Sequence, residues 1–213
     1  MDSTDFSVLS MFIAMAIFLG IFYFLRIRQI QAERKARARM VLERRKKFAN
    51  ITLDMFDEIE RKELPEMVIY SILAKDEKRF DGEEIDDTPI MEMLSEAERM
   101  VFTIYQVESC LSGKNSSIHS FFLEEYFAPY IPYLTPAFDV MNCHEISKLL
   151  ESAKKLAEII ESDSEEEVGG DYESYNFGDY TNELLSLMKS SALVKNTAEY
   201  IYENKEQFVE KED

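Results

Sequence analysis

Apolar residues follow two different patterns along the 213-residue chain. Residues 6–25, FSVLSMFIAMAIFLGIFYFL, form one uncharged run, whereas beyond residue 48 apolar residues recur every three or four positions. The clearest series has a 4-3-4-3-4 spacing and consists of Met93, Ala97, Met100, Ile104, Val107 and Leu111. Such spacing places one apolar stripe along an α-helix. The pattern predicts a hydrophobic N-terminal helix followed by amphipathic helices.

The amphipathic part of the chain predicts a bundle of about five helices. Further stripes lie at residues 51–59, 65–80, 143–161 and 181–205. Thr88-Pro89 is typical of a helix start and Gly113 of a helix end, and no stretch alternates as a β-strand does. We therefore predict an all-α fold, with an acidic helical bundle over residues 49–160 and a C-terminal helix and tail over residues 181–213.

The N-terminal run is long enough to cross a bilayer. At about 1.5 Å per residue, a helix over residues 6–25 spans about 30 Å, the thickness of the hydrocarbon core. A cleaved signal peptide fits less well, because no basic residue precedes the run and bulky residues end it. We predict an uncleaved transmembrane helix at residues 6–25, after a short extracytoplasmic N-terminus at residues 1–5.

The distribution of charge adds an orientation to this prediction. The net charge is −18, yet residues 26–47 contain ten Lys/Arg and two Asp/Glu, while residues 48–213 contain 14 Lys/Arg and 38 Asp/Glu. Because basic residues concentrate on the cytoplasmic side of a first span, we expect a single-pass membrane protein with the N-terminus outside and the remainder in the cytoplasm. Residues 26–48 lack Pro and Gly and should continue the span as a basic juxtamembrane helix.

The basic block has three interpretations. We favour contact with anionic lipid headgroups, through Arg26, Arg28, Arg34, Lys35, Arg37, Arg39, Arg44, Arg45, Lys46 and Lys47. Docking onto an acidic protein surface is the second interpretation. Nucleic-acid binding is the third and is disfavoured, because the rest of the chain would repel phosphates. A coiled coil is only weakly indicated, since arginine takes three of seven seam positions.

Aromatic residues and prolines are concentrated in residues 120–138, SFFLEEYFAPYIPYLTPAF. Prolines at this spacing prevent a continuous helix, so we expect a short helix, an ordered elbow and a new helix at Thr135-Pro136. The rings have two interpretations, a core between helical hairpins or a docking surface for a partner. The candidate docking residues are Phe122, Tyr126, Phe127, Tyr130 and Tyr133.

Residues 161–180, ESDSEEEVGGDYESYNFGDY, are rich in acidic residues and glycine. With much charge and little to bury, this segment predicts an acidic flexible loop. Ser162 and Ser164 each precede a glutamate by three positions, and Tyr172, Tyr175 and Tyr180 have acidic neighbours. Regulation by phosphorylation stays open beside a plain solvated linker.

No arrangement typical of a catalytic, metal or cofactor site stands out. Cys110, Cys143, His119 and His144 lack the close spacing of zinc ligands, except for the adjacent Cys143-His144. Neither histidine has the flanking signature of a hydrolase, and no Gly-rich phosphate loop occurs. We predict no enzyme activity, no metal and no cofactor.

These patterns predict a membrane-anchored interaction module or accessory subunit of a membrane-associated complex. Its acidic bundle would bind a protein partner with a basic surface. One alternative is an assembler that oligomerises through the span, where Ser10/Ala14 and Ala16/Gly20 are small residues four apart that suit a homodimer. A less favoured alternative is a membrane-tethered enzyme with its site around Cys143 and His144.

Overall fold

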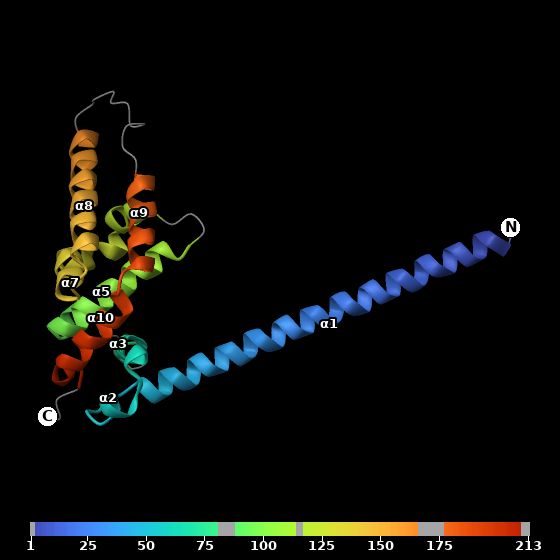
Figure 1. Ribbon diagram of the computed structural model, residues 1–213, viewed down its shortest axis with the longest axis horizontal. Helices are drawn as coiled ribbons and strands as arrows, with labels where there is room; N and C mark the ends of the chain where they lie inside the picture. The colour runs from blue at the N-terminus through green and yellow to red at the C-terminus, as the bar shows by residue number, and fades with distance from the viewer. Residues whose placement is uncertain (1–2, 81–87, 114–116, 166–176, 210–213) are drawn as a thin grey trace. The chain divides into compact units, whose positions relative to one another are not determined.

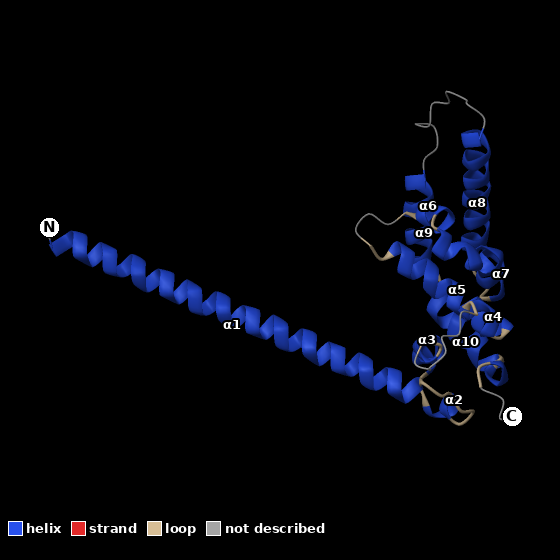
Figure 2. Cartoon of the chain, turned by 180° about the vertical axis from the view of Figure 1, so that it is seen from behind, coloured by secondary structure: helices blue, strands red, loops and turns tan. Residues whose placement is uncertain are grey.

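The structure is a computed structural model that describes residues 3–80, 88–113, 117–165 and 177–209 (Figure 1). Side chains are described from residue 22 onward, apart from those at 37, 161 and 163–165. Every regular element in these ranges is helical, and Figure 2 draws no strand in them. The predicted all-helical character is therefore confirmed. The chain divides into two compact units, Met1–Lys46 and Lys47–Asp213.

The first unit consists of one helix, α1 (Ser3–Phe48), which continues into the start of the second. The helix is uninterrupted over 46 residues. Its basic block is built from Arg, Lys, Ala, Gln and Glu, which are all strong helix formers. Gln29 Nε2 donates to Glu33 Oε1 at 3.1 Å, one turn further on. The helix expected across residues 26–48 is present.

The predicted transmembrane helix is contradicted by the structure. Across the residues that are described, no helix combines the length and the apolar character needed to cross a membrane. From Phe22 onward the side chains of α1 include only a short apolar start before the basic block, and the side chains of residues 6–21 lie outside the described set. This finding contradicts the predicted span at residues 6–25 and the single-pass membrane location. The extracytoplasmic residues 1–5 and the outward N-terminus were parts of the same prediction and are withdrawn with it.

Two interpretations were built on that span, and the described residues test neither of them. Contact of the basic block with lipid headgroups assumed a membrane beside residue 25. Oligomerisation through Ser10/Ala14 and Ala16/Gly20 assumed a helix in lipid, and the side chains of those residues also lie outside the described set.

The second unit contains the remaining helices. They are α2 (Met55–Glu58), η1 (Arg61–Glu63), α3 (Leu64–Lys78), α4 (Ile90–Met93), α5 (Glu96–Leu111), α6 (Ile118–Leu123), η2 (Glu125–Tyr133), α7 (Leu134–Val140), α8 (His144–Glu165), α9 (Phe177–Ser190), α10 (Leu193–Glu203) and η4 (Lys205–Gln207). Five of these elements, α3, α6, η2, α7 and η4, contact α5, while α8 packs against α7 and α9 (Figure 1).

Helix α5 lies at the centre of this unit. The stripe predicted by the spacing is confirmed on one side of α5, where Ala97, Ile104 and Val107 are buried. The adjoining residues Phe102 and Thr103 are buried too, because α3, α6, α7 and η2 all contact α5. The helix is thus enclosed on several sides rather than half-exposed.

The helix expected from Thr88-Pro89 to Leu111 is broken at Leu94. Leu94 has an extended backbone, with φ −83° and ψ 146°, and separates α4 from α5. A capping box then starts α5: Glu98 N donates to Ser95 Oγ at 3.2 Å, and Ser95 N donates to Glu98 Oε2 at 2.9 Å. Met93, the first residue of the predicted stripe, is consequently exposed.

The C-terminal helix expected near residues 181–205 is likewise divided. It forms α9 and α10, with Ser191 and Ala192 between them. Leu193 N donates to Ser191 Oγ at 3.4 Å, and Asn196 Nδ2 donates to Met141 O at 2.8 Å. These contacts fix the start of α10 against the end of α7. Leu184 and Ile201 still face the core, as the spacing predicted.

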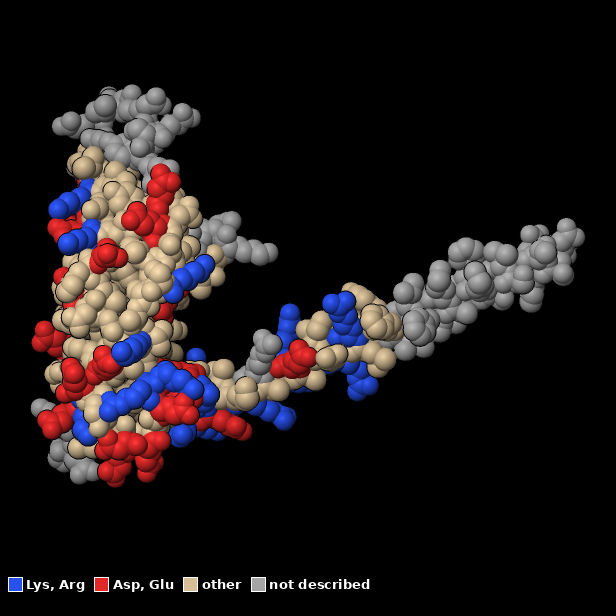
Figure 3. Space-filling view, in the orientation of Figure 1, with Lys and Arg blue, Asp and Glu red and all other residues tan. Residues whose placement is uncertain are grey.

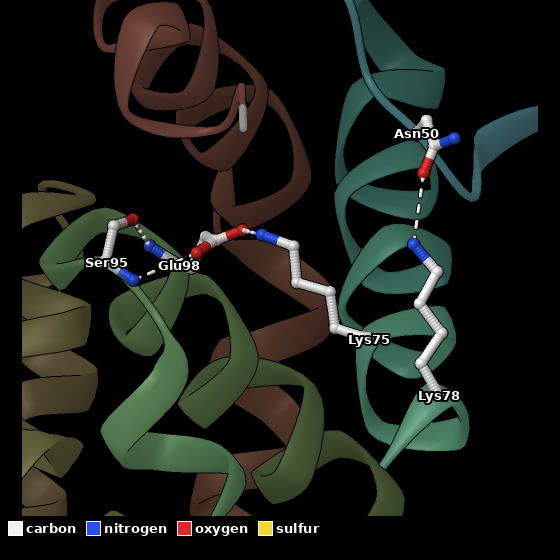
Figure 4. A network of polar contacts seen from close by, with 5 residues as sticks. All are labelled: Asn50, Lys75, Lys78, Ser95 and Glu98. Atoms are coloured by element: carbon white, nitrogen blue, oxygen red, sulfur yellow. Dashed lines mark hydrogen bonds and ion pairs between the residues drawn. The ribbon is translucent and has the colours of Figure 1, made fainter. Parts of the chain in front are cut away.

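A partly buried ion pair joins α3 to α5 (Figure 4). Lys75 Nζ donates to Glu98 Oε1 at 2.7 Å, and the side chains are 16% and 4% exposed. Glu98 therefore accepts from Lys75 with one oxygen and caps its own helix with the other. Nearby, Lys78 Nζ donates to Asn50 Oδ1 at 3.3 Å, which ties α3 to the segment before α2.

Removing Lys75 should destabilise the fold markedly. Lys75→Met leaves the Glu98 carboxylate buried without its cation, so the free energy of unfolding should fall by about 3 kcal/mol. Ser95→Ala, which removes only the cap, should cost about 1 kcal/mol. Urea unfolding followed by far-UV circular dichroism measures both changes. Lys154→Met is the control, because Lys154 contacts Glu158 at the surface of α8; an equal loss in both lysine variants would contradict this account.

Candidate interaction surface

The aromatic segment forms the elbow that its prolines predicted. Helix α6 ends at Leu123, and Glu124 is extended, with φ −82° and ψ 123°. Pro129 and Pro132 lie within the 3₁₀ helix η2. A continuous α-helix could not accommodate these two prolines, because each removes a backbone donor and clashes with the preceding turn. Helix α7 then begins at Leu134. The elbow therefore turns the chain between α6 and α7 while both helices contact the core.

The five candidate docking residues are divided between the core and the surface. Phe127 and Tyr130 are buried, Phe122 and Tyr133 are half-buried, and Tyr126 is 63% exposed. Phe127 stacks on Phe121, with 4.7 Å between ring centroids. Both interpretations of the rings thus apply to part of the set. Binding of a partner by these residues stays a prediction.

A cavity of about 310 Å³ opens beside the elbow. Residues of α3, α5 and η2 supply most of its wall. The cavity is lined by Leu73, Asp76, Arg79, Phe80, Ile90, Phe102, Tyr105, Gln106, Ser109, Tyr126 and Tyr130. Five of these side chains are aromatic, and we call this cavity the aromatic pocket.

The rings of the aromatic pocket contact one another in sequence. Phe102 stacks on Tyr105 with 5.8 Å between centroids, and Tyr130 meets Phe102 edge-on at 5.7 Å. Tyr126 lies 6.3 Å from Tyr130, centroid to centroid. Gln106 Nε2 donates to the Tyr130 hydroxyl at 3.4 Å. The buried ring of Tyr130 is therefore fixed between α5 and the exposed ring of Tyr126.

Burial raises the pKa of the Tyr130 hydroxyl well above its usual range, and the nearby Tyr126 and the carboxylate of Asp76 raise it further. The hydrogen bond from Gln106 opposes this shift. Tyr130 therefore stays protonated at neutral pH and can serve the pocket as a hydrogen-bond donor or acceptor.

One side of the aromatic pocket is charged. Arg79 Nη1 contacts Asp76 Oδ1 at 2.7 Å, and the guanidinium carbon of Arg79 lies 5.2 Å from the centroid of the Phe80 ring. The Arg79 side chain is 10% exposed, whereas that of Asp76 is 38% exposed. The carboxylate is thus the more accessible partner of this pair.

A second cavity of about 820 Å³ lies between η1 and α10. Most of its charged groups have partners: Arg61 lies over the Tyr202 ring, Lys62 contacts Glu60, and Lys195 contacts Glu199 at 3.6 Å. The cavity is lined by three basic and two acidic side chains together with apolar surface, so it has no strong excess of either sign.

The cysteines and histidines contact groups other than one another in the part of the chain that the structure describes. The ring of His144 contacts Asp139 Oδ1 at 3.1 Å, and that of His119 stacks on Phe177 at 4.1 Å. Burial raises the pKa of both the Cys143 and the Cys110 thiols, which disfavours the reactive thiolate. Among the residues that the structure describes, no three His, Cys, Asp or Glu side chains are placed to hold a metal ion.

Comparison with known families adds an identity to this geometry. The model of a family described as DMP19-like protein matches residues 92–204, which is more than half of the chain. The chain belongs to the DMP19-like protein family. No curated protein and no solved structure matches the chain. The family description names no activity, so function has to be argued from the molecule itself.

The DMP19-like region extends from α4 to α10. It includes the elbow, α5 and the tyrosine side of the aromatic pocket. It includes neither α1 nor α3, which contains Asp76 and is followed directly by Arg79. The pocket therefore combines the family region with a preceding helix of this chain.

The basic block lies wholly in α1. Eight of its ten basic side chains are exposed: Arg26, Arg28, Arg34, Lys35, Arg39, Arg44, Lys46 and Lys47. Arg45 is half-buried, and the side chain of Arg37 lies outside the described set. Docking of this block onto an acidic protein surface, the second of the interpretations above, stays a prediction.

The predicted acidic loop falls mostly outside the described residues. Helix α8 continues to Glu165, so Ser162 is helical, and its hydroxyl donates to Ile159 O at 2.8 Å. Tyr180 lies in α9 and packs against the core. Tyr172 and Tyr175, and the side chain of Ser164, belong to the part that is not described.

Alkaline pH should destabilise the protein through Tyr130. Because the pKa of Tyr130 is raised in the folded state, its contribution to stability is complete below the usual tyrosine pKa of about 10 and is lost as the pH rises further. Tyr130→Phe should therefore make the free energy of unfolding fall less steeply above pH 10, in urea titrations at several pH values. Tyr23→Phe, at an exposed position of α1, should keep the wild-type slope; a Tyr130→Phe slope equal to wild type would contradict the assignment.

Proposed function

We propose that this DMP19-like protein is a non-enzymatic interaction module or accessory subunit that binds a protein partner with a basic surface. The observation that carries the proposal is the excess of acidic residues after the basic block: 38 Asp/Glu against 14 Lys/Arg in residues 48–213, a net charge of −24. A field of this sign attracts cationic surfaces and accelerates their association.

The acidic residues are displayed on a folded scaffold. Figure 3 shows Asp and Glu side chains spread over the visible face of the helical unit, with Lys and Arg side chains and uncharged surface among them. Beneath this surface lies a continuous core that includes Phe56, Phe121 and Phe138. Fixed charges on a rigid surface favour partner recognition, because little conformational freedom is lost on binding.

The elbow supplies apolar contact area within this acidic surface. Leu123 is 66% exposed and lies three residues before the exposed Tyr126. Glu124 and Glu125, between them in sequence, are exposed as well. Stable interfaces combine buried aromatic or aliphatic anchors with a polar rim, and this elbow has both kinds of group.

The alternative of an enzyme around Cys143 and His144 has less support. The Cys143 thiol donates to Met141 O at 3.5 Å and is buried, while the His144 ring contacts the exposed Asp139. A nucleophile and its base would need to contact each other. The proposed function accordingly assigns these two side chains to the structure.

A photo-crosslinking residue at Tyr126 should capture the partner. The probe is placed in the full chain in its native cells, and captured proteins are identified by mass spectrometry. We expect a specific adduct whose contact surface is basic, and whose yield falls as salt rises, since screening weakens exposed charges. The same probe at Ser152, an exposed position of α8, is the control.

Charge removal at the elbow provides the second arm of this experiment. Glu124→Gln combined with Glu125→Gln should reduce affinity for the captured partner about threefold, without changing the thermal unfolding of the chain. Equal capture at Tyr126 and Ser152, or an acidic partner whose binding does not respond to salt, would contradict the proposed function.

A further inference from the structure

We propose that the aromatic pocket receives an arginine side chain of the partner, with the guanidinium between the ring of Tyr126 and the carboxylate of Asp76. The inference rests on the proposed function, because it specifies which group of a basic partner this surface recognises. Its test is independent of whichever partner the crosslinking identifies.

The rings provide the first part of the argument. Tyr126 and Phe80 are exposed and line the pocket from η2 and from the end of α3, whereas Phe102 and Tyr130 form its buried wall. The face of an aromatic ring is electronegative and attracts a cation within about 6 Å of its centroid. A pocket lined by five such rings suits a flat cation better than it suits a carboxylate.

The polar groups provide the second part. The pocket offers the Asp76 carboxylate, the tyrosine hydroxyls and the Ser109 hydroxyl as hydrogen-bond acceptors. A guanidinium presents five N–H donors in one plane, and these match acceptors at its edge while its face stacks on a ring. Lysine would use the charge of Asp76 but could not combine the two contacts in this way.

The protein already uses this combination once in the same pocket. Arg79 places one edge of its guanidinium against Asp76 Oδ1 and its face near the Phe80 ring. A carboxylate has two oxygens and accepts from more than one donor, so Asp76 can hold Arg79 and an incoming arginine together.

The positive charge of Arg79 is the main argument against a second cation. Arg79 is nearly buried and paired with Asp76, which leaves the more exposed carboxylate facing the approach. The chain after the basic block also carries its large acidic excess, whose summed field favours the approach of cations. An acidic side chain drawn to Arg79 is the competing occupant and is tested directly.

The size of the pocket fits one side chain. At about 310 Å³ it lies at the lower end of the range for small-molecule sites, about 300–1,000 Å³. A partner could therefore insert a single arginine, while its remaining contacts lie on the elbow around Leu123.

Binding of short peptides to the full chain tests the inference. The probes are a fluorescent hexa-arginine peptide, the same peptide with citrulline in place of arginine, and a hexa-glutamate peptide, measured by fluorescence polarisation at 0.15 M salt. Citrulline preserves the shape of arginine and removes its charge. We expect the wild-type chain to bind the arginine peptide at least tenfold more tightly than the other two.

Matched variants separate the pocket from the general acidic surface. Tyr126→Ala should weaken binding of the arginine peptide about fivefold, while Tyr126→Phe, which keeps the ring, should bind nearly as wild type. Asp76→Asn should weaken binding about fivefold or more. Glu183→Gln removes the same charge at an exposed position of α9 and should weaken binding less than twofold.

Three results would overturn the inference. They are equal effects of Asp76→Asn and Glu183→Gln, no effect of Tyr126→Ala, and preference of the wild-type chain for the glutamate or citrulline peptide. In the first two cases, salt-dependent binding of the arginine peptide would still agree with the proposed function. If the wild-type chain binds none of the peptides, the proposal that the aromatic pocket binds arginine is also wrong. The crosslinking experiment then tests the proposed function by itself.

Discussion

The enclosure of α5 is the constraint on which the unit Lys47–Asp213 depends. A polar group that is buried without a partner costs about 1–3 kcal/mol. In α5 the Thr103 hydroxyl bears this cost because it has no hydrogen-bond partner among the described residues, whereas the two larger buried polar side chains of the helix do have partners. Glu98 lies at its first turn and Gln106 in its second half, and both are buried. Each polar group is satisfied by a different neighbour: Glu98 by Lys75 of α3, and Gln106 by Tyr130 of η2. The polar residues of α5 therefore select which elements lie against it.

The same contacts build the aromatic pocket. Lys75 holds α3 beside α5, which brings the next residue, Asp76, and then Arg79 to the pocket wall. Gln106 holds η2 against α5, which brings Tyr130 and, four residues earlier in η2, Tyr126 to the pocket wall. The aromatic pocket is thus a consequence of the hydrogen bonds that Glu98 and Gln106 make.

Local pattern predicted the helices from the sequence, but tertiary contacts decided their limits and their exposure. The spacing of Ala97, Ile104 and Val107 identified α5, and the prolines identified the elbow. The break at Leu94 had a signal that was not used, Ser95 followed by Glu98, which is a capping box. No local sequence signal indicates that Tyr130 is buried while Tyr126 is exposed, because residues distant in the sequence determine which face of a short 3₁₀ helix is packed. The apolar run at residues 6–25 was interpreted by length and composition alone, and that interpretation failed.

Charge and pocket would act at different distances during recognition. Under the proposed function, the acidic excess would act over the screening length of about 8 Å at physiological salt and would govern the approach of a partner and its rate of association. The rings and Asp76 would act only in contact, where cation–π and hydrogen-bond geometry would govern dissociation. A basic surface without a suitably placed arginine would then associate quickly and leave quickly, whereas one that inserts an arginine would remain. Selectivity among basic partners follows from the second step, because the net charge of the chain attracts all of them alike.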